Sequence, residues 1–138
     1  DWSSDVCSSD LATGGIILSQ VTARLLGVRS IFTERENGKM TLRRGFKIAP
    51  GEKVLIVEDI VTTGGSIKEV VDVVNKAKGD IVGIGLFVDR SGGKADFGVP
   101  KEKVYPLLHL TVPTYKPEEC PLCKAGVPIT ERGSHHLK

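Results

Sequence analysis

The chain has 138 residues, which is enough for one globular domain with a single hydrophobic core and too few for two. Hydrophobic residues make up 40% and charged residues 26% of the sequence, which excludes a disordered, collagen-like or coiled-coil protein. The formal net charge of +2 gives no electrostatic reason to expect nucleic acid or an anionic membrane as a partner.

No segment has the features of a membrane span or of a secretory signal. The longest apolar run, residues 81–88, is far shorter than the ~20 residues that cross a bilayer. The first residues are acidic and rich in serine rather than basic and then apolar. Three cysteines are too few for a disulfide scaffold, so we expect a cytoplasmic protein.

Residues 1–11, DWSSDVCSSDL, differ in character from the rest of the chain. They hold a near-repeat, WSSDV and CSSDL, without helical or strand periodicity, and resemble the translated adapter sequence found at the ends of some assembled reading frames. We expect a non-native leader at 1–11, a domain at 12–132 and a frayed tail at 133–138. A genuine disordered N-terminus is the alternative interpretation.

The first half of the domain shows one helical and two strand patterns. Apolar residues at helical spacing predict a helix from about Gly14 to Leu26. Strands are predicted at 28–34 and 42–48, joined by a polar loop with Asn37-Gly38 as its turn.

The second half alternates strands with a helix. Residues 53–57 are apolar on both faces, as expected of the central strand of a parallel sheet. A helix ending near Gly79 follows, with Ser66 and Glu69 as its capping box. Strands at 81–88 and 104–112, separated by a glycine-rich loop at 91–98, complete an α/β pattern with a mostly parallel sheet.

The stretch VLIVEDIVTTGGS, residues 54–66, carries the chemistry. A buried strand ends in Glu58 and Asp59, and a loop of threonines and glycines then opens a helix. Ligands bind at the carboxyl ends of parallel strands, and free N–H groups at a helix start favour a phosphate. Adjacent carboxylates suit sugar hydroxyls and Mg²⁺. These features indicate a phosphorylated sugar; an ordinary capped turn with a solvated acidic pair is the alternative.

This stretch resembles the phosphoribosyl-pyrophosphate (PRPP) signature of type I phosphoribosyltransferases at every position. The resemblance implies a Rossmann-like core in which the acidic pair contacts the ribose hydroxyls, with Mg²⁺ nearby as the cofactor, and the loop wraps the 5′-phosphate. The PRPP-binding residues it implies in this segment are Glu58, Asp59, Ile60, Val61, Thr62, Thr63, Gly64, Gly65 and Ser66.

Positive charge is concentrated in residues 29–47, where six Lys or Arg side chains face two Glu: Arg29, Arg35, Lys39, Arg43, Arg44 and Lys47. A mobile basic loop can neutralise a pyrophosphate leaving group and exclude water, whereas a solvated hairpin is the alternative. ERENGKMTLRRGF resembles the flexible catalytic loop of short orotate phosphoribosyltransferases. The resemblance implies a homodimer and places Arg35 and Lys39 on the pyrophosphate, with Lys39 and Asp59 as the catalytic pair; which of Lys39, Arg43 and Arg44 acts stays open.

The segment FVDRS, residues 87–91, places Arg90 where another parallel strand ends. A fixed guanidinium can bind a planar carboxylate bidentately, which orotate offers and adenine, guanine and uracil do not. A surface ion pair with Asp89 is the alternative. The resemblance to orotate enzymes implies that Arg90 holds orotate together with Thr62.

The activity implied by these resemblances is Mg²⁺-dependent transfer of ribose 5-phosphate from PRPP to orotate. The products are orotidine 5′-phosphate and pyrophosphate, in the synthesis of UMP. A purine phosphoribosyltransferase and a regulator that binds PRPP without turnover are the two alternatives. Neither nucleic acid nor a membrane is expected as a partner.

Two weaker features remain. Cys120 and Cys123 have the spacing of half a zinc knuckle that His135 and His136 could complete, although the tail resembles the C-terminal end of short orotate phosphoribosyltransferases, which favours a structural role. His109 is expected to be a core or cross-strand residue.

The resemblance begins abruptly near Ala12. Gly14-Gly15 match the end of the family's pyrophosphate loop, but the preceding strand and the N-terminal hood over the base have no counterpart. We therefore expect a sheet that lacks its first strand, and a chain that folds poorly or is inactive.

Overall fold

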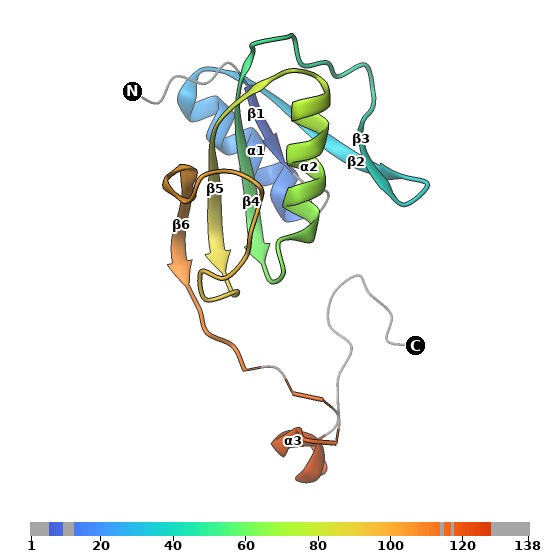
Figure 1. Ribbon diagram of the computed structural model, residues 1–138, viewed down its shortest axis with the longest axis vertical. Helices are drawn as coiled ribbons and strands as arrows, with labels where there is room; N and C mark the ends of the chain where they lie inside the picture. Colours follow the sequence, from blue (N-terminus) through green and yellow to red (C-terminus); the bar gives the residue numbers. More distant parts are fainter. Residues whose placement is uncertain (1–5, 10–12, 114, 117, 128–138) are drawn as a thin grey trace.

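The computed structural model describes residues 6–9, 13–113, 115–116 and 118–127. Over these residues one six-stranded sheet runs through the molecule in the order β3-β2-β1-β4-β5-β6 (Figure 1). All neighbouring strands are parallel except the β2–β3 pair, which is antiparallel. The predicted α/β fold with a mostly parallel sheet is therefore confirmed. The strands are β1 (Val6–Ser9), β2 (Arg29–Glu36), β3 (Lys39–Leu42), β4 (Lys53–Val61), β5 (Asp80–Asp89) and β6 (Val104–His109).

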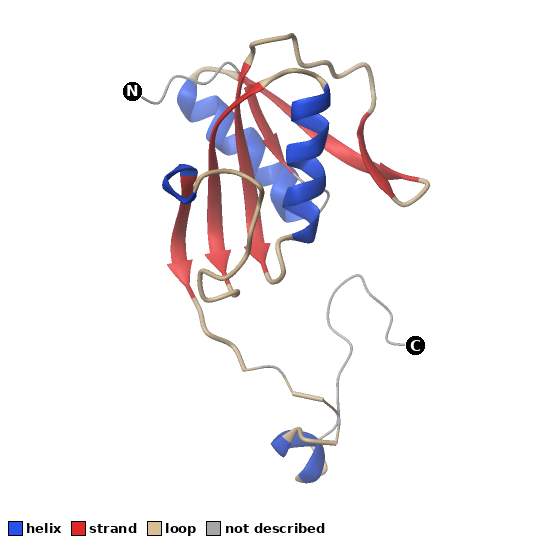
Figure 2. Ribbon diagram, viewed as in Figure 1, coloured by secondary structure: helices blue, strands red, loops and turns tan. Residues whose placement is uncertain are grey.

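Two helices cover opposite faces of the sheet (Figure 2). Successive residues of a strand point to opposite faces, and β4 is buried on both. Leu55 and Val57 pack with Ala23 of α1 (Thr13–Leu26). Val54 and Ile56 pack in the larger core with the apolar stripe of α2 (Gly65–Lys76), which consists of Ile67, Val70, Val71 and Val74. This two-sided burial explains why the strand at 53–57 is apolar throughout.

Two short helices complete the described structure, η1 (Lys101–Lys103) before β6 and α3 (Pro121–Lys124) near the C-terminal end. None of the described helices is long and apolar enough to span a membrane.

The strand predicted to be missing is present. Val6–Ser9 forms β1 between β2 and β4, with Cys7 in register with Ser30 on one side and Leu55 on the other. The prediction of a sheet without its first strand was wrong, because backbone pairing on both sides can order a segment whose own side chains lack a strand pattern. Residues 1–5, 10–12 and 133–138 lie outside the described residues; the foreign origin of the leader and the absent hood stay predictions.

The β2–β3 hairpin is tighter than predicted. β2 extends to Glu36, and the return strand is Lys39–Leu42 rather than 42–48. Asn37 and Gly38 both have positive φ, 51° and 79°, and Glu36 pairs directly with Lys39. This is the geometry of a two-residue Asn-Gly turn, which starts the return strand at once. The last strand also differs, since β6 ends at His109 and not at 112.

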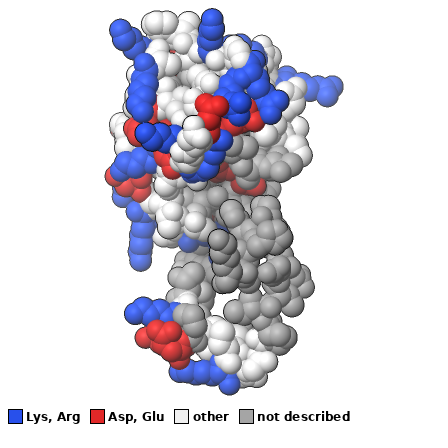
Figure 3. Space-filling view, turned by 90° about the vertical axis from the view of Figure 1, so that its right-hand side faces the viewer, with Lys and Arg blue, Asp and Glu red and all other residues white. Residues whose placement is uncertain are grey.

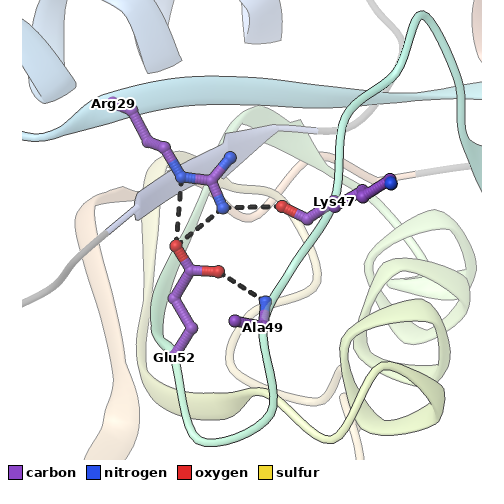
Figure 4. Close-up of polar contacts among 4 residues, drawn as sticks. All are labelled: Arg29, Lys47, Ala49 and Glu52. Carbon is purple, nitrogen blue, oxygen red and sulfur yellow. Dashed lines mark hydrogen bonds and ion pairs between the residues drawn. The ribbon is translucent and has the colours of Figure 1, made fainter.

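Arg29 joins the start of β2 to the turn before β4 (Figure 4). Its guanidinium donates to Glu52 Oε1 from Nε at 3.0 Å and from Nη2 at 2.6 Å, and to the Lys47 carbonyl at 2.6 Å. Glu52 Oε2 accepts the Ala49 N–H at 2.7 Å. Arg29 and Val54 both align with Val6, so this network lies at the amino ends of the strands. Arg29, one of the six basic side chains of residues 29–47, therefore forms its ion pair at the opposite end of the sheet from the carboxyl ends of the strands.

Replacing Glu52 with Ala should lower the free energy of unfolding by about 1 kcal/mol, because the Arg29 guanidinium and the Ala49 N–H both lose an acceptor near the surface. Urea unfolding at neutral pH measures this change. Glu102→Ala, at an exposed position of η1, is the matched control and should leave the midpoint where it is. Equal midpoints for the two variants would contradict a stabilising role for the network.

Candidate functional site

Glu58 and Asp59 lie near the carboxyl end of β4, but within the strand rather than after it. The strand continues to Val61 because β5 continues beside it, pairing Ile60 with Val88 and Val61 with Asp89. Being neighbours in a strand, the two carboxylates point to opposite faces of the sheet. Glu58 is buried and its Oε1 accepts the Asp59 N–H at 2.9 Å. Asp59 is half-buried, which leaves it the more accessible of the two to a ligand.

The loop between β4 and α2 presents hydroxyl groups to solvent. Thr62, Thr63 and Ser66 are exposed. The N-cap of α2 is Gly64, in the left-handed region with φ 83°, and no side chain caps the helix from this position. The predicted capping box of Ser66 and Glu69 is therefore wrong. The N–H groups of the first turn of a twelve-residue helix, next to three hydroxyls, suit an anion such as phosphate.

Gly64 is required by its backbone and by its neighbours. A Cβ there would lie 2.8 Å from Phe97 Cε1 and 3.2 Å from Ala95 Cβ, in the loop that follows β5. Gly64→Ala should therefore lower the free energy of unfolding by about 1–3 kcal/mol, since it adds strain at positive φ to a clash. Gly65→Ala is the matched control, because its Cβ would meet only Thr63 Oγ1, at 3.9 Å. Thermal unfolding of both variants tests this, and equal losses would contradict it.

Arg35 contacts α2 rather than projecting freely from the hairpin. Its Nη1 and Nη2 donate to Glu69 Oε2 at 2.9 Å and Oε1 at 3.0 Å, and Nη1 also donates to the Gly38 carbonyl at 3.0 Å. The Met40 N–H donates to Glu69 Oε2 at 3.3 Å. The Arg35 hydrogen bonds lower the pKa of Glu69 against the opposing effect of burial. Glu69 thus fixes the β2–β3 hairpin to α2, the helix that begins directly after the loop of threonines and glycines.

The other hairpin cations differ in how they are engaged. Arg44 donates to both Glu34 oxygens, at 2.9 and 2.8 Å, and Arg43 lies 3.4 Å from Glu36. Among these candidates Lys39 makes no ion pair within the described part of the chain. Figure 3 shows basic side chains, with acidic ones among them, over the side of the molecule on which the hairpin projects. Lys39 is therefore the cation of this group that is free to meet an incoming anion.

Arg90 follows β5 directly and sits beside the end of β4. Its N–H donates to the Val61 carbonyl at 2.8 Å. Its side chain is half-buried, and the buried Nε donates to no acceptor among the described residues. Arg90 forms no ion pair with Asp89, so the interpretation of these two residues as a surface ion pair is wrong.

Asp89 instead organises the loop that follows Arg90. Its carboxylate accepts the Ser91 N–H at 2.7 Å and the Gly93 N–H at 3.1 Å, and lies 3.3 Å from His109 Nδ1. Burial acts to raise the pKa of Asp89, but the hydrogen bonds from Ser91 and Gly93, together with His109, outweigh it and lower that pKa. His109 is thus a cross-strand partner as predicted, but its side chain is 60% exposed and does not belong to the core.

A pocket of about 390 Å³ opens beneath the loop after β5. It includes none of the predicted ligand-binding residues, although Asp89 reaches it from beside Arg90. Its lining consists of Asp89, Gly93, Lys94, Ala95, Asp96, Phe97, Val99, Lys101, Val104, Pro106 and His109. No pattern in the sequence pointed to this pocket, because its walls come from one loop, η1 and two strands that meet only in the fold.

Cys120 and Cys123 are free thiols at α3. Within the described residues no three His, Cys, Asp or Glu side chains are grouped so that they could hold a metal ion. His135 and His136, the predicted completing ligands, lie outside the described residues.

A phosphoribosyl transferase domain model matches residues 11–99. The chain is 58% identical over 127 residues to an orotate phosphoribosyltransferase of Thermotoga maritima, covering 92% of this chain and 66% of that protein. It is 56% identical over 126 residues to one of Desulforamulus reducens, covering 91% and 64%. The chain thus spans just under two thirds of the length of these curated relatives.

Solved structures share the fold. Adenine phosphoribosyltransferase from Rhodothermus marinus superposes with a TM-score of 0.61 at 20% identity, over 80% of this chain and 72% of that one. The adenine phosphoribosyl transferase of Trypanosoma brucei, solved with AMP, pyrophosphate and ribose-5-phosphate, has a TM-score of 0.63 at 18% identity, over 98% and 65%. With the domain match over residues 11–99 and the loop described above, these similarities show that the chain belongs to the phosphoribosyltransferase family.

Proposed function

We propose that this chain carries the activity of an orotate phosphoribosyltransferase, the transfer of ribose 5-phosphate from PRPP to orotate with release of pyrophosphate. The product is orotidine 5′-phosphate, a precursor of UMP. Family membership and curated relatives named for this activity support the proposal. The observation that carries it is the position of Arg90 beside the hydroxyl-rich loop, since the Arg90 N–H bonds to Val61 immediately before Thr62.

In this proposal the loop and the acidic pair bind different parts of PRPP, the ribosyl donor. The backbone and hydroxyls of residues 62–66 bind the 5′-phosphate at the start of α2. Asp59 accepts hydrogen bonds from the ribose hydroxyls, and Glu58 holds the Asp59 backbone in place through its 2.9 Å hydrogen bond. Ile60 and Val61 contribute position rather than side-chain chemistry, because they hold the end of β4 against β5.

Mg²⁺ fits this donor set. The Asp59 carboxylate offers the hard oxygen ligands that Mg²⁺ prefers and, being half-buried, leaves room for retained water, whereas the buried Glu58 points to the opposite face of the sheet. When bound with PRPP, the ion would neutralise charge on the pyrophosphate. In this proposal the ion would be held mainly by PRPP with Asp59 beside it, and Glu58 would act on the Asp59 backbone through its hydrogen bond.

The leaving pyrophosphate is neutralised from the hairpin. Lys39 acts first in this proposal, because Arg43 and Arg44 are paired with Glu36 and Glu34. Arg35 can bind the pyrophosphate only if its ion pair with Glu69 breaks first. No covalent nucleophile is needed, since positioning and electrostatic stabilisation serve a transfer in which charge develops on the leaving group.

Arg90 supplies the selectivity for orotate. A buried guanidinium nitrogen without an acceptor is costly, and the carboxylate of orotate can satisfy it. Thr62, exposed just after the end of β4, contributes a hydroxyl in this proposal. Neither purines nor uracil offers such a carboxylate.

The active form in this proposal is a cytoplasmic homodimer. The outer face of α1 exposes apolar side chains, with Ile17 61%, Val21 51% and Leu25 82% exposed. Such a face is typical of a surface that packs against another subunit.

Nucleotide binding to the 138-residue chain tests the proposal without requiring turnover. Orotidine 5′-phosphate and UMP differ only by the carboxylate, so we expect the former to bind at least about tenfold more tightly by calorimetry. Arg90→Gln should abolish that difference while retaining UMP binding. Equal affinities in the native chain, or tighter binding of AMP, would contradict the orotate assignment and favour a purine enzyme.

Turnover separates an enzyme from a regulator. If the chain is an enzyme, we expect it to consume PRPP only when orotate is present. The loss of orotate absorbance measures this reaction. Binding of PRPP without product would favour the regulator of the same fold. The expectation that this chain is inactive rested partly on the missing strand, whose place β1 occupies.

A further inference from the structure

Cys120 and Cys123 stand one helical turn apart in a geometry that can close a disulfide. Cys120 is the N-cap of α3, with φ −68° and ψ 119°, and its carbonyl accepts the Lys124 N–H at 3.0 Å. The Cys123 N–H and the Cys123 thiol both hydrogen-bond with the Cys120 sulfur, which brings the two sulfur atoms next to each other. Pro121 at the first helical position fixes the turn between them. A disulfide here would join two sulfur atoms that already contact each other across one turn of the chain.

The two thiols have different environments. The Cys123 N–H donates to the Cys120 sulfur and lowers the pKa of Cys120 against the effect of burial, helped by the Cys123 thiol and the Leu122 N–H. The pKa of Cys123 is raised, first by its hydrogen bond to Cys120 and then by burial and by the charge of Cys120. Cys120 is therefore the sulfur that ionises first, and the thiolate is the reactive form.

Both groups are accessible, and the segment is independent of the sheet. Residues 121–127 are all exposed, Cys120 is half-buried, and neither cysteine belongs to the hydrophobic cores. Oxidation of this pair would leave the packing of the domain intact. Within the described residues no third His, Cys, Asp or Glu side chain is grouped with the pair.

We propose that Cys120 and Cys123 form a redox-active dithiol that exchanges with low-molecular-weight disulfides such as oxidised glutathione. The Cys120 thiolate attacks one sulfur of the disulfide, whose S–S bond breaks and releases one thiolate that takes up a proton. Cys123 then loses its proton and attacks the Cys120 sulfur, forming the Cys120–Cys123 bond and releasing the second thiol. The protein is oxidised by two electrons and the small disulfide is reduced to two thiols.

The test is incubation of the reduced full chain with oxidised glutathione, followed by mass spectrometry of the tryptic peptide that contains both cysteines. We expect the peptide to lose two hydrogen atoms and retain no glutathione. Cys123→Ser should retain one glutathione on Cys120, because the resolving thiol is gone. Cys120→Ser should react several-fold more slowly than Cys123→Ser, because the Cys123 and Leu122 N–H groups still lower the pKa of Cys120 in Cys123→Ser, whereas no such donor lowers the pKa of Cys123.

Three outcomes would overturn the proposal: a native peptide that carries two glutathiones, equal reaction rates for the two variants, or bound zinc that blocks the native thiols from reacting. Unfolding midpoints of both variants serve as the structural control. They should equal that of the native chain, because the pair lies outside both cores.

Discussion

Asp59→Asn is expected to weaken the binding of PRPP with Mg²⁺ by about 10- to 100-fold, the scale of losing hydrogen bonds to a charged acceptor. The amide keeps the shape of the carboxylate but loses the charge that sugar hydroxyls and the metal ion prefer. Its carbonyl oxygen can still accept the Ile60 N–H, which lies 2.7 Å from Asp59 Oδ1. The loss should therefore appear in affinity and not in stability.

Calorimetric titration with PRPP and Mg²⁺ measures this change, and urea unfolding checks the fold. Asp72→Asn is the matched control, because Asp72 is an exposed carboxylate on α2 away from the loop. It should bind PRPP as the native chain does. Unchanged affinity and turnover in Asp59→Asn would show that the acidic pair does not bind PRPP. The interpretation of residues 54–66 as the PRPP-binding segment would then be wrong.

Asp89→Asn is expected to lower the free energy of unfolding by about 1–3 kcal/mol at neutral pH, because the Ser91 and Gly93 N–H groups lose part of a buried charged acceptor. One amide oxygen cannot serve Ser91, Gly93 and His109 together, and the amide nitrogen faces N–H groups instead. The loop should loosen next to Arg90, so the preference for orotidine 5′-phosphate over UMP should fall as well.

The effect of Asp89→Asn on the free energy of unfolding should depend on pH. The pKa of Asp89 is lowered in the folded chain, so its contribution is present above the ordinary carboxyl range and is lost as the pH falls below about 4. The stability gap between the native chain and Asp89→Asn should therefore narrow in acid. Urea unfolding at neutral and acidic pH measures it, with Asp80→Asn, at an exposed position, as the control. A gap that stayed constant with pH would contradict the role of the ionised carboxylate.

Much of the fold could be predicted because its signals are local. The apolar runs at 54–57 and 81–88 became β4 and β5, and the helical spacing after Gly14 became α1. Asn37-Gly38 indicated the turn correctly, but the length of the following strand depended on pairing with β2, which no local pattern specifies. β1 shows the same limit more strongly, since two neighbouring strands order it.

The partners of charged groups could not be predicted. Glu69 has the spacing of a helix cap, yet it binds Arg35, which is 34 residues away in the sequence. Asp89 and Arg90 are neighbours in the sequence, yet Asp89 binds Ser91, Gly93 and His109 instead. A carboxylate pairs with whichever donor the fold brings within reach, and that depends on how distant segments pack.

The sequence by itself determined which chemical groups lie next to each other along the chain. The acidic pair, the loop of threonines and glycines, and the helix that follows belong to one uninterrupted stretch. Only the tertiary structure decided that Glu58 is buried while Asp59 is accessible, that Lys39 is unpaired among the described hairpin cations, and that Arg90 lies beside the loop. Burial and pairing are set by contacts between segments far apart in the chain, whereas the order of residues in a motif is not.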